Sequence, residues 1–151
     1  MARLEFPLES LLRYRRRQEE ERQLELAGLQ QRLEEERAAL GHLEDRRARA
    51  LEELRDGQTS PRLDLVEIGC SLAYLSSLAT AIAAQEQLIA RLGEQVEGAR
   101  QRLLEASRSV KTVERLKEVW LEEQRLDLLK REEKAAEEAA TSQFNRRASE
   151  A

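Results

Sequence analysis

The chain has 151 residues, of which 37% are charged and only 3% aromatic. This composition provides too little apolar bulk for a layered globular core, and it suits a solvated helical protein. The net charge of -4, with both signs interleaved along the chain, argues against a basic nucleic-acid footprint, so we expect no nucleic-acid partner.

The first predicted helix covers residues about 4–56. It opens at Phe6-Pro7, where the missing N–H of Pro7 costs nothing in a first helical turn. Downstream, a stripe alternates steps of three and four, which predicts one side of a coiled coil. The stripe consists of Leu26, Leu29, Leu33, Glu36, Leu40, Leu43, Arg47, Ala50 and Leu54. Upstream of it, the segment Arg13–Arg22 contains no aliphatic residue, so we expect loose pairing there.

A turn is predicted at residues about 57–61. Gly57 suits the left-handed position after a helix, Ser60 suits an N-cap, and Pro61 suits a first helical turn. Because so short a connection makes neighbouring helices antiparallel, the simplest architecture is a helical hairpin. The second helix is expected over residues about 62–143, followed by a frayed C-terminal tail.

The second predicted helix carries apolar residues at seven-residue intervals: Ile68, Leu75, Ile82, Ile89, Val96, Leu103 and Val110. This period is kept only where an underwound helix packs against another helix. A companion stripe starts as Leu65, Leu72 and Ala79 and continues, after a change of phase, as Leu92, Ala99, Ala106 and Val113. Since aliphatic residues are dense between Leu63 and Ile82, we expect the strongest packing next to the turn. The predicted fold is all-α: a long antiparallel two-helix coiled-coil hairpin with unequal arms, forming a single domain over residues 1–151.

The two predicted arms differ in length. Pairing them about the turn places Leu8 beside Val110, and the second helix then continues past the start of the first. Its later apolar residues are Val113, Leu116, Trp120, Leu121, Leu126, Leu128 and Leu129. Two interpretations stay open: an unpartnered helix carrying Trp120 is a docking surface, or Trp120 packs against Leu4, Phe6 and Leu8.

Catalytic and metal-binding groups are scarce in this sequence. His42 is the only histidine and Cys70 the only cysteine, which excludes a multi-histidine zinc site and an intramolecular disulfide. The six glycines are scattered and form no phosphate-binding loop. We expect no enzyme activity, cofactor or metal. We also see no apolar run of the roughly 20 residues that a membrane helix needs and no signal-peptide core, so we expect a cytoplasmic protein without a membrane span.

Several segments together resemble a known family. They are the opening Phe6-x-Leu8-x-x-Leu11-Leu12-x-x-Arg15, the long charged hairpin, and the closing stretches Val113–Lys117 and Arg131–Ala139. Over most of the chain this combination resembles FliJ, a coiled-coil protein family of the bacterial flagellar export apparatus. The resemblance implies a non-enzymatic stalk similar to the shaft of rotary ATPases. It would promote assembly and activity of the hexameric export ATPase, contact the export gate membrane protein, and help to handle export chaperones. It implies a place at the cytoplasmic face of the inner membrane, in flagellum biogenesis and motility.

The resemblance also directs attention to two partner-binding surfaces. For the ATPase end we predict the basic residues of both termini and one aromatic residue: Arg13, Arg15, Arg16, Arg17, Arg115, Lys117 and Trp120. The alternative for the arginine run is ion pairing within the helix. For the export gate, the matching positions are Leu43, Tyr74, Leu78, Ala81 and Gln85. The alternative is that Leu43 and Leu78 simply belong to the seam between the helices. This sequence also departs from the family pattern, since Arg46 and Ala50 stand at positions that the resemblance matches with aromatic residues.

Two other functions stay open. One is the stalk of a virulence-type secretion ATPase, which would have the same shape. The other is a general structural coiled-coil adaptor, which explains the periodicity equally well but not the combination of the two termini. The same stripes could also pair between chains. Because the short turn makes pairing within one chain cheaper in entropy, we expect a monomer.

Overall fold

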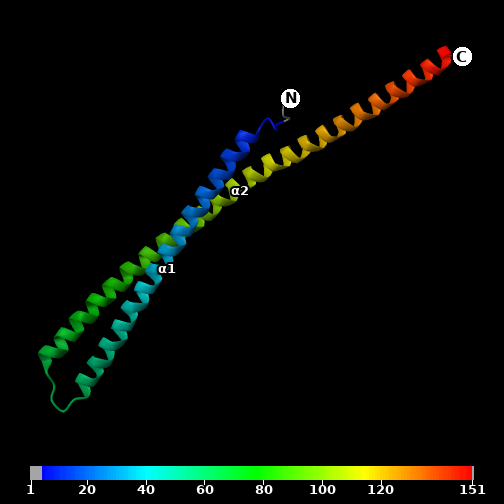
Figure 1. Ribbon diagram of the computed structural model, residues 1–151. Helices are drawn as coiled ribbons and strands as arrows, with labels where there is room; N and C mark the ends of the chain where they lie inside the picture. The colour runs from blue at the N-terminus through cyan, green and yellow to red at the C-terminus, as the bar shows by residue number, and fades with distance from the viewer. Residues whose placement is uncertain (1–4, 151) are drawn as a thin grey trace. The chain divides into compact units, whose positions relative to one another are not determined.

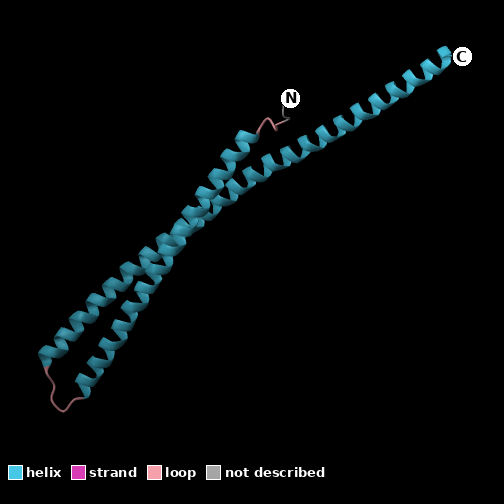
Figure 2. Ribbon diagram, viewed as in Figure 1, coloured by secondary structure: helices cyan, strands magenta, loops and turns pink. Residues whose placement is uncertain are grey.

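The computed structural model describes residues 5–150. Almost all of them lie in two helices, α1 (Glu9–Thr59) and α2 (Leu65–Glu150), and this described part of the chain contains no strand (Figure 2). The chain divides into two compact units. The loop unit is Glu20–Leu104, and the terminal unit combines residues 5–19 with residues 105–150. In the loop unit α1 and α2 lie side by side and run in opposite directions (Figure 1), which confirms the predicted all-α antiparallel hairpin.

The end of α1 lies later than the sequence predicted. The helix passes through Gly57 and ends at Thr59, whose Oγ1 donates to the carbonyls of Arg55 and Asp56 at 3.1 Å each. Pro61 has no N–H for a further helical hydrogen bond, and it disfavours the helical conformation for the residue before it. Among the described glycines none has a positive φ. The predicted turn at 57–61 is therefore wrong, and the loop covers residues 60–64.

The start of α2 is set by Asp64. Its Oδ1 accepts hydrogen bonds from the backbone N–H groups of Val66 at 3.0 Å and Glu67 at 3.3 Å. A carboxylate in this position satisfies two of the donors that a helix start leaves without partners, and its charge favours the positive end of the helix dipole. The predicted cap at Ser60 with Pro61 in the first turn is therefore wrong.

The first turn of α1 also begins later than predicted. Pro7 restricts Phe6 to an extended conformation, so the helix starts only at Glu9, whose N–H donates to the Phe6 carbonyl at 3.1 Å. Residue 4, the predicted start, lies outside the described residues.

The C-terminal part of α2 is helical as far as Glu150, so the predicted end at residue 143 is wrong. Alanine, glutamate and arginine dominate this stretch, and all three have high helix propensity. Arg147 lies in the last turn, where a positive side chain complements the helix dipole. High local propensity thus favours continuation of the helix here.

Two neighbouring heptad lines of α2 form one contact face against α1 in the loop unit. Every seventh residue from Ile68 to Leu103 is buried or half-buried, as the period predicted. The companion line, however, keeps one phase throughout: Ser71, Leu78, Gln85, Leu92 and Ala99. Leu65 and Leu72 are 78% and 52% exposed, so the predicted change of phase is wrong. A helix with one partner must keep one contact line, even where that line includes polar residues such as Ser71 and Gln85.

The best-packed part of the loop unit lies away from the turn. One core cluster joins Leu33 of α1 to Leu92 and Val96 of α2, with Leu26, Leu29, Leu88 and Ile89 packed around it. The aliphatic residues beside the loop are exposed, with Leu63 at 60% and Val66 at 75%. The expectation of strongest packing next to the turn is therefore wrong. The part of α1 before the loop, residues 44–56, is dominated by charged side chains and offers them little to pack against.

A second core cluster lies in the terminal unit. It consists of Phe6, Leu12, Val110 and Val113, with Leu11 and Trp120 packed against it. Leu12 is completely buried, whereas Leu8 is 39% exposed. The predicted pairing of Leu8 with Val110 is therefore displaced by one helical turn, because the loop follows residue 59 and not residue 56.

α2 contains a stretch of 18 residues with a mean hydropathy of 1.6, enough for a membrane span by length and composition alone. The prediction that no such run exists is wrong. Residues 68–85 contain no charged side chain. In the loop unit they form one arm of the hairpin, with Leu78 and Ile82 buried.

Candidate partner-binding surfaces

The two chain segments of the terminal unit are joined by ion pairs as well as by the core cluster. Lys117 Nζ lies 2.9 Å from Glu9 Oε2, and Arg16 Nη2 lies 3.5 Å from Glu114 Oε1. The close ammonium group of Lys117 is the main cause of a lowered pKa for the Glu9 carboxyl group. Lys117 is thus engaged within the unit, at the edge of the helix pair.

The arginine run on α1 presents a basic surface. Arg13, Arg16 and Arg17 are exposed, and neither Arg13 nor Arg17 forms an ion pair with any residue between 5 and 150. Arg15 is half-buried and donates to Gln18 Oε1 at 3.3 Å. Arg13 and Arg17 are thus the side chains of this run whose charge is most available to a partner.

Trp120 is part of the helix pair. Its ring centroid lies 5.7 Å from that of Phe6, with an interplanar angle of 55°. A tilted aromatic pair of this kind adds to the apolar burial on both sides. The alternative in which Trp120 packs against Phe6 is confirmed. Leu4, named in the same alternative, lies outside the described residues.

Gln124 is the last residue of α2 that is not fully exposed. Every residue from Arg125 to Glu150 is exposed, and this segment continues alone past the start of α1 within the terminal unit (Figure 1). We call it the C-terminal arm. Its large exposed apolar residues are Leu126, Leu128, Leu129 and Phe144. The sequence carried a signal for this boundary. After Gln124 the next positions on the seam line are the charged residues Asp127, Arg131 and Lys134, so the line offers no apolar side chains for a partner helix.

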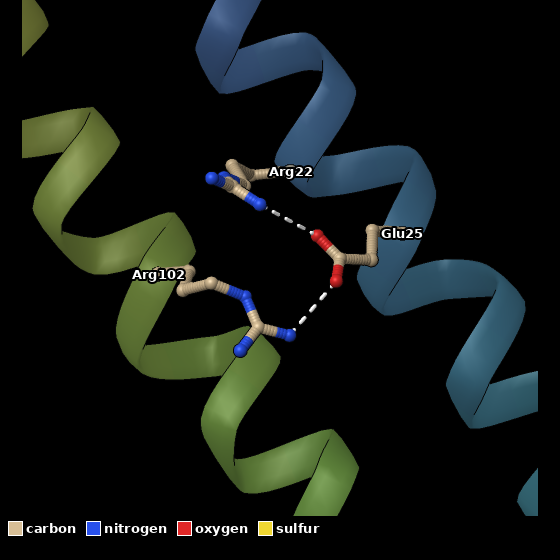
Figure 3. Close-up of polar contacts among 3 residues, drawn as sticks. All are labelled: Arg22, Glu25 and Arg102. Carbon is tan, nitrogen blue, oxygen red and sulfur yellow. Dashed lines mark hydrogen bonds and ion pairs between the residues drawn. The ribbon is translucent and has the colours of Figure 1, made fainter.

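The loop unit has a charged layer where the two helices meet, shown in Figure 3. Glu25 accepts a hydrogen bond from Arg22 Nη1 at 3.0 Å on the same helix and from Arg102 Nη2 at 2.8 Å on α2. Arg102 therefore ties α2 to α1 at one register, because its charge-assisted bond requires Glu25 to lie opposite.

This layer gives the hairpin a defined response to acid. The bonds from Arg22 and then Arg102 lower the pKa of Glu25 below its ordinary value of 4.5. Stability from this group is therefore present above pH 4.5 and is lost as the pH falls through the lower pKa of the folded state. We expect Glu25→Gln to lower the melting temperature modestly at neutral pH, because the carboxylate is partly exposed. In acid, thermal melts followed by circular dichroism should give the unchanged protein and the Glu25→Gln variant the same melting temperature. A difference that does not change with pH would contradict this assignment.

Of the residues predicted for the export gate, two of those on α2 lie in the seam and two lie on its flank. Leu78 is only 5% exposed, and Gln85 Nε2 donates to the Glu36 carbonyl at 2.9 Å and to its Oε2 at 2.6 Å. Both side chains lie in the seam. Tyr74 is 48% exposed, and Ala81, seven residues later, lies half-buried on the same flank of α2. Leu43 is half-buried on α1.

Metal-ligating and reactive groups are dispersed. His42 and Cys70 are both exposed. Across the part of the chain that the structure describes, no cluster of three His, Cys, Asp or Glu residues is arranged to hold a metal ion.

The fold and its surfaces define an all-helical hairpin protein with charged and apolar side chains exposed on its helices. Its sequence matches the family described as "Flagellar FliJ protein" over residues 4–149, which is nearly the whole chain. The chain belongs to the FliJ family and is a non-enzymatic protein related to flagellar export. No curated protein and no solved structure matches it.

Proposed function

We propose that this protein is the stalk of the flagellar export ATPase. In this function it promotes assembly and activity of the hexameric ring, connects the ring to the export gate, and helps to handle export chaperones in the cytoplasm beside the inner membrane. Membership of the FliJ family carries the proposal. A terminal unit that combines exposed arginines with an exposed helical arm supports it.

The terminal unit is the end that we assign to the ATPase. Arg13 and Arg17 have no ion pair among the described residues, so their charges can steer an acidic surface toward this end. Every residue of the C-terminal arm from Arg125 to Glu150 is exposed, and an unsupported helix gains stability when a partner covers it. A ring of similar subunits can use such a surface without a rigid fit.

The loop unit is the end that we assign to the export gate. Tyr74 provides an exposed aromatic surface, and Ala81 extends the same flank of α2. Leu78 and Gln85 support this flank from inside the seam, so truncating them would weaken the hairpin itself. Tyr74 is therefore the side chain through which contact with the gate is best tested.

A charge reversal tests the ATPase end. We expect Arg13→Glu combined with Arg17→Glu to weaken binding to the purified export ATPase about tenfold, a free-energy change of roughly 1.4 kcal/mol, and to reduce ATPase stimulation. The loss should shrink as salt is raised, because exposed charges are screened. Binding is measured by titration at low and high salt.

The matched control reverses Arg46 and Arg49, two exposed arginines of the loop unit, which changes the net charge equally. An equal loss in the control would remove the assignment of this end. If the unchanged chain neither binds nor stimulates the ATPase, the general coiled-coil adaptor becomes the better interpretation.

A further inference from the structure

The apolar seam of the loop unit repeats itself along both helices. On α1, Leu26, Leu33 and Leu40 stand seven residues apart, and on α2 the line from Ile68 to Leu103 keeps the same period. If one helix slid along the other by seven residues, aliphatic side chains would again lie opposite aliphatic side chains. Apolar packing alone therefore distinguishes these registers poorly, and coiled coils commonly use a polar residue in the seam to choose between them.

The loop does little to fix the register. Leu63 and Val66 are 60% and 75% exposed, and the capping bonds of Asp64 run only to residues of its own helix. A slide by seven residues would pass about one turn of helix from one arm to the other through the loop. The choice of register therefore depends on contacts across the seam.

Two polar contacts cross the seam of the loop unit. Gln85 Nε2 donates to the Glu36 carbonyl at 2.9 Å and to Glu36 Oε2 at 2.6 Å, and both residues are half-buried. Eleven residues earlier on α1 and seventeen later on α2, Arg102 Nη2 donates to Glu25 Oε1 at 2.8 Å (Figure 3). The core cluster around Leu92 lies between the two contacts along both helices.

We propose that these two contacts together form a register lock, which lets the seam close in the observed register and excludes the registers displaced by seven residues. A lock of this kind acts on the alternatives. It contributes less to the stability of the observed pairing than to the instability of the others. A polar pair within a helix seam lowers stability relative to an apolar pair while it specifies the pairing.

The contact between Glu36 and Gln85 excludes a slide in either direction. A slide by seven residues places each of the two side chains beside a leucine: Leu29 or Leu43 for Gln85, and Leu78 or Leu92 for Glu36. A leucine can neither accept from the Gln85 amide nor donate to the Glu36 carboxylate. A half-buried polar group without a partner loses its bonds to water and gains none in exchange, so both displaced registers are disfavoured.

The contact between Glu25 and Arg102 acts in the same sense. A slide in one direction places Arg102 opposite Gln18, and a slide in the other direction places it opposite Arg32. The first exchanges a charge-assisted hydrogen bond for a weaker one, and the second brings two positive charges together. The two contacts therefore exclude the same displaced registers at two separate points of the seam.

The register also decides which residues of the two helices share a surface. Leu43 on α1 and Tyr74 and Ala81 on α2 were matched with the surface for the export gate. A slide by seven residues would move Leu43 by about 10 Å relative to the other two. We therefore expect the lock to hold the two sides of that surface together. This consequence rests on the proposed function, whereas the lock itself does not.

Disulfide trapping within one chain reports the register. In a Cys70→Ser background, Ala50→Cys is combined with one further cysteine on α2. Leu33 and Leu92 pack together in the core cluster. Ala50 and Leu75 each lie seventeen residues nearer the loop, so Ala50→Cys with Leu75→Cys reports the observed register.

Two further cysteine pairs report the displaced registers. Ile68→Cys and Ile82→Cys each stand seven residues from Leu75, and each is combined with Ala50→Cys in its own chain. Linked peptides are quantified by mass spectrometry at low protein concentration, where cross-links within one chain dominate. With both polar contacts in place, we expect only the pair at Leu75 to cross-link efficiently.

Removal of the lock should release the displaced registers. We expect Glu36→Leu with Gln85→Leu to raise cross-linking of the displaced pairs about tenfold. Adding Glu25→Leu and Arg102→Leu should raise it further. The melting temperature should not fall, because both members of each contact across the seam are replaced by apolar side chains. Contacts that only stabilise the hairpin would give the opposite result, a lower melting temperature and an unchanged register.

The matched control is Glu35→Leu with Gln87→Leu, which removes an exposed carboxylate and an exposed amide next to the lock. It should cross-link only in the observed register. Two results would overturn the proposal. One is a chain without either polar contact whose displaced pairs stay at the level of the control, since apolar packing would then select the register. The other is a loss of helicity in that chain, since the contacts would then maintain the fold and not choose its register.

Binding to the purified export gate protein is measured separately on the same variants. If the unchanged protein binds the gate, the variants with displaced registers should bind it more weakly than the control does. If the unchanged protein does not bind the gate, the proposed function fails at this end, and the cross-linking experiment still decides whether the lock exists.

Discussion

Leu92→Ala should lower the free energy of unfolding by about 2–4 kcal/mol. Leu92 is 2% exposed and lies in the core cluster with Leu33 and Val96. Truncation removes buried apolar surface and leaves a cavity that the two packed helices cannot easily close. A protein of this size has only about 5–15 kcal/mol of stability, so the loss is a large part of the total.

Urea denaturation followed by far-UV circular dichroism measures this loss, at one fixed protein concentration because association shifts apparent stability. Leu24→Ala is the matched control: the same truncation at a residue 74% exposed should change the free energy of unfolding by less than about 0.5 kcal/mol. Similar losses in the two variants would mean that the cluster around Leu92 does not stabilise the hairpin.

The heptad line of α2 could be predicted from the sequence because it is a local property of one helix. Ile68, Ile82 and Val96 stand fourteen residues apart whatever their partner is, and all are buried or half-buried. The companion line was harder to predict from the sequence. Leu65 and Leu72 are more apolar than Ser71 and are nevertheless exposed. Local apolarity favoured the leucines, whereas the geometry of a single partner decided the contact.

The loop could not be placed from the sequence because several residues competed for one boundary. Gly57, Ser60 and Pro61 each favour a helix end or start, but the Asp64 side chain makes the two capping hydrogen bonds. Moving the loop by a few residues moves the pairing of the helices. That is why Leu12 occupies the buried position that was expected for Leu8.

The candidate surfaces depended on this pairing even more strongly. Tyr74 and Arg13 could be predicted as exposed, since neither lies on a heptad line of the seam. The contact of Trp120 with Phe6 depends on where α1 ends against α2, so the sequence left two alternatives open. The position of Gln85 in the seam, bonded to Glu36, likewise required both helices to be in place.

Removal of the C-terminal arm should abolish stimulation of the export ATPase while leaving the hairpin folded. A stop after Gln124 removes the segment Arg125–Glu150, which is exposed throughout, and the ion pair of Arg125 that it loses is a surface pair with Glu122 on the same helix. We therefore expect the midpoint of the thermal melt to stay unchanged. A stop before Trp120 would instead remove the partner of Phe6 and confuse loss of folding with loss of function.

The full-length chain carrying Leu126→Ser, Leu128→Ser and Leu129→Ser separates the apolar side chains of the arm from its charges. If the leucines make the contact with the ATPase, this variant should stimulate the ATPase as weakly as the truncated chain. If the charges make it, stimulation should persist at low salt and fall as salt is raised. A truncated chain that still stimulates fully would show that the ATPase is contacted through α1, and the exposed arginines Arg13 and Arg17 would then have to account for all of the effect.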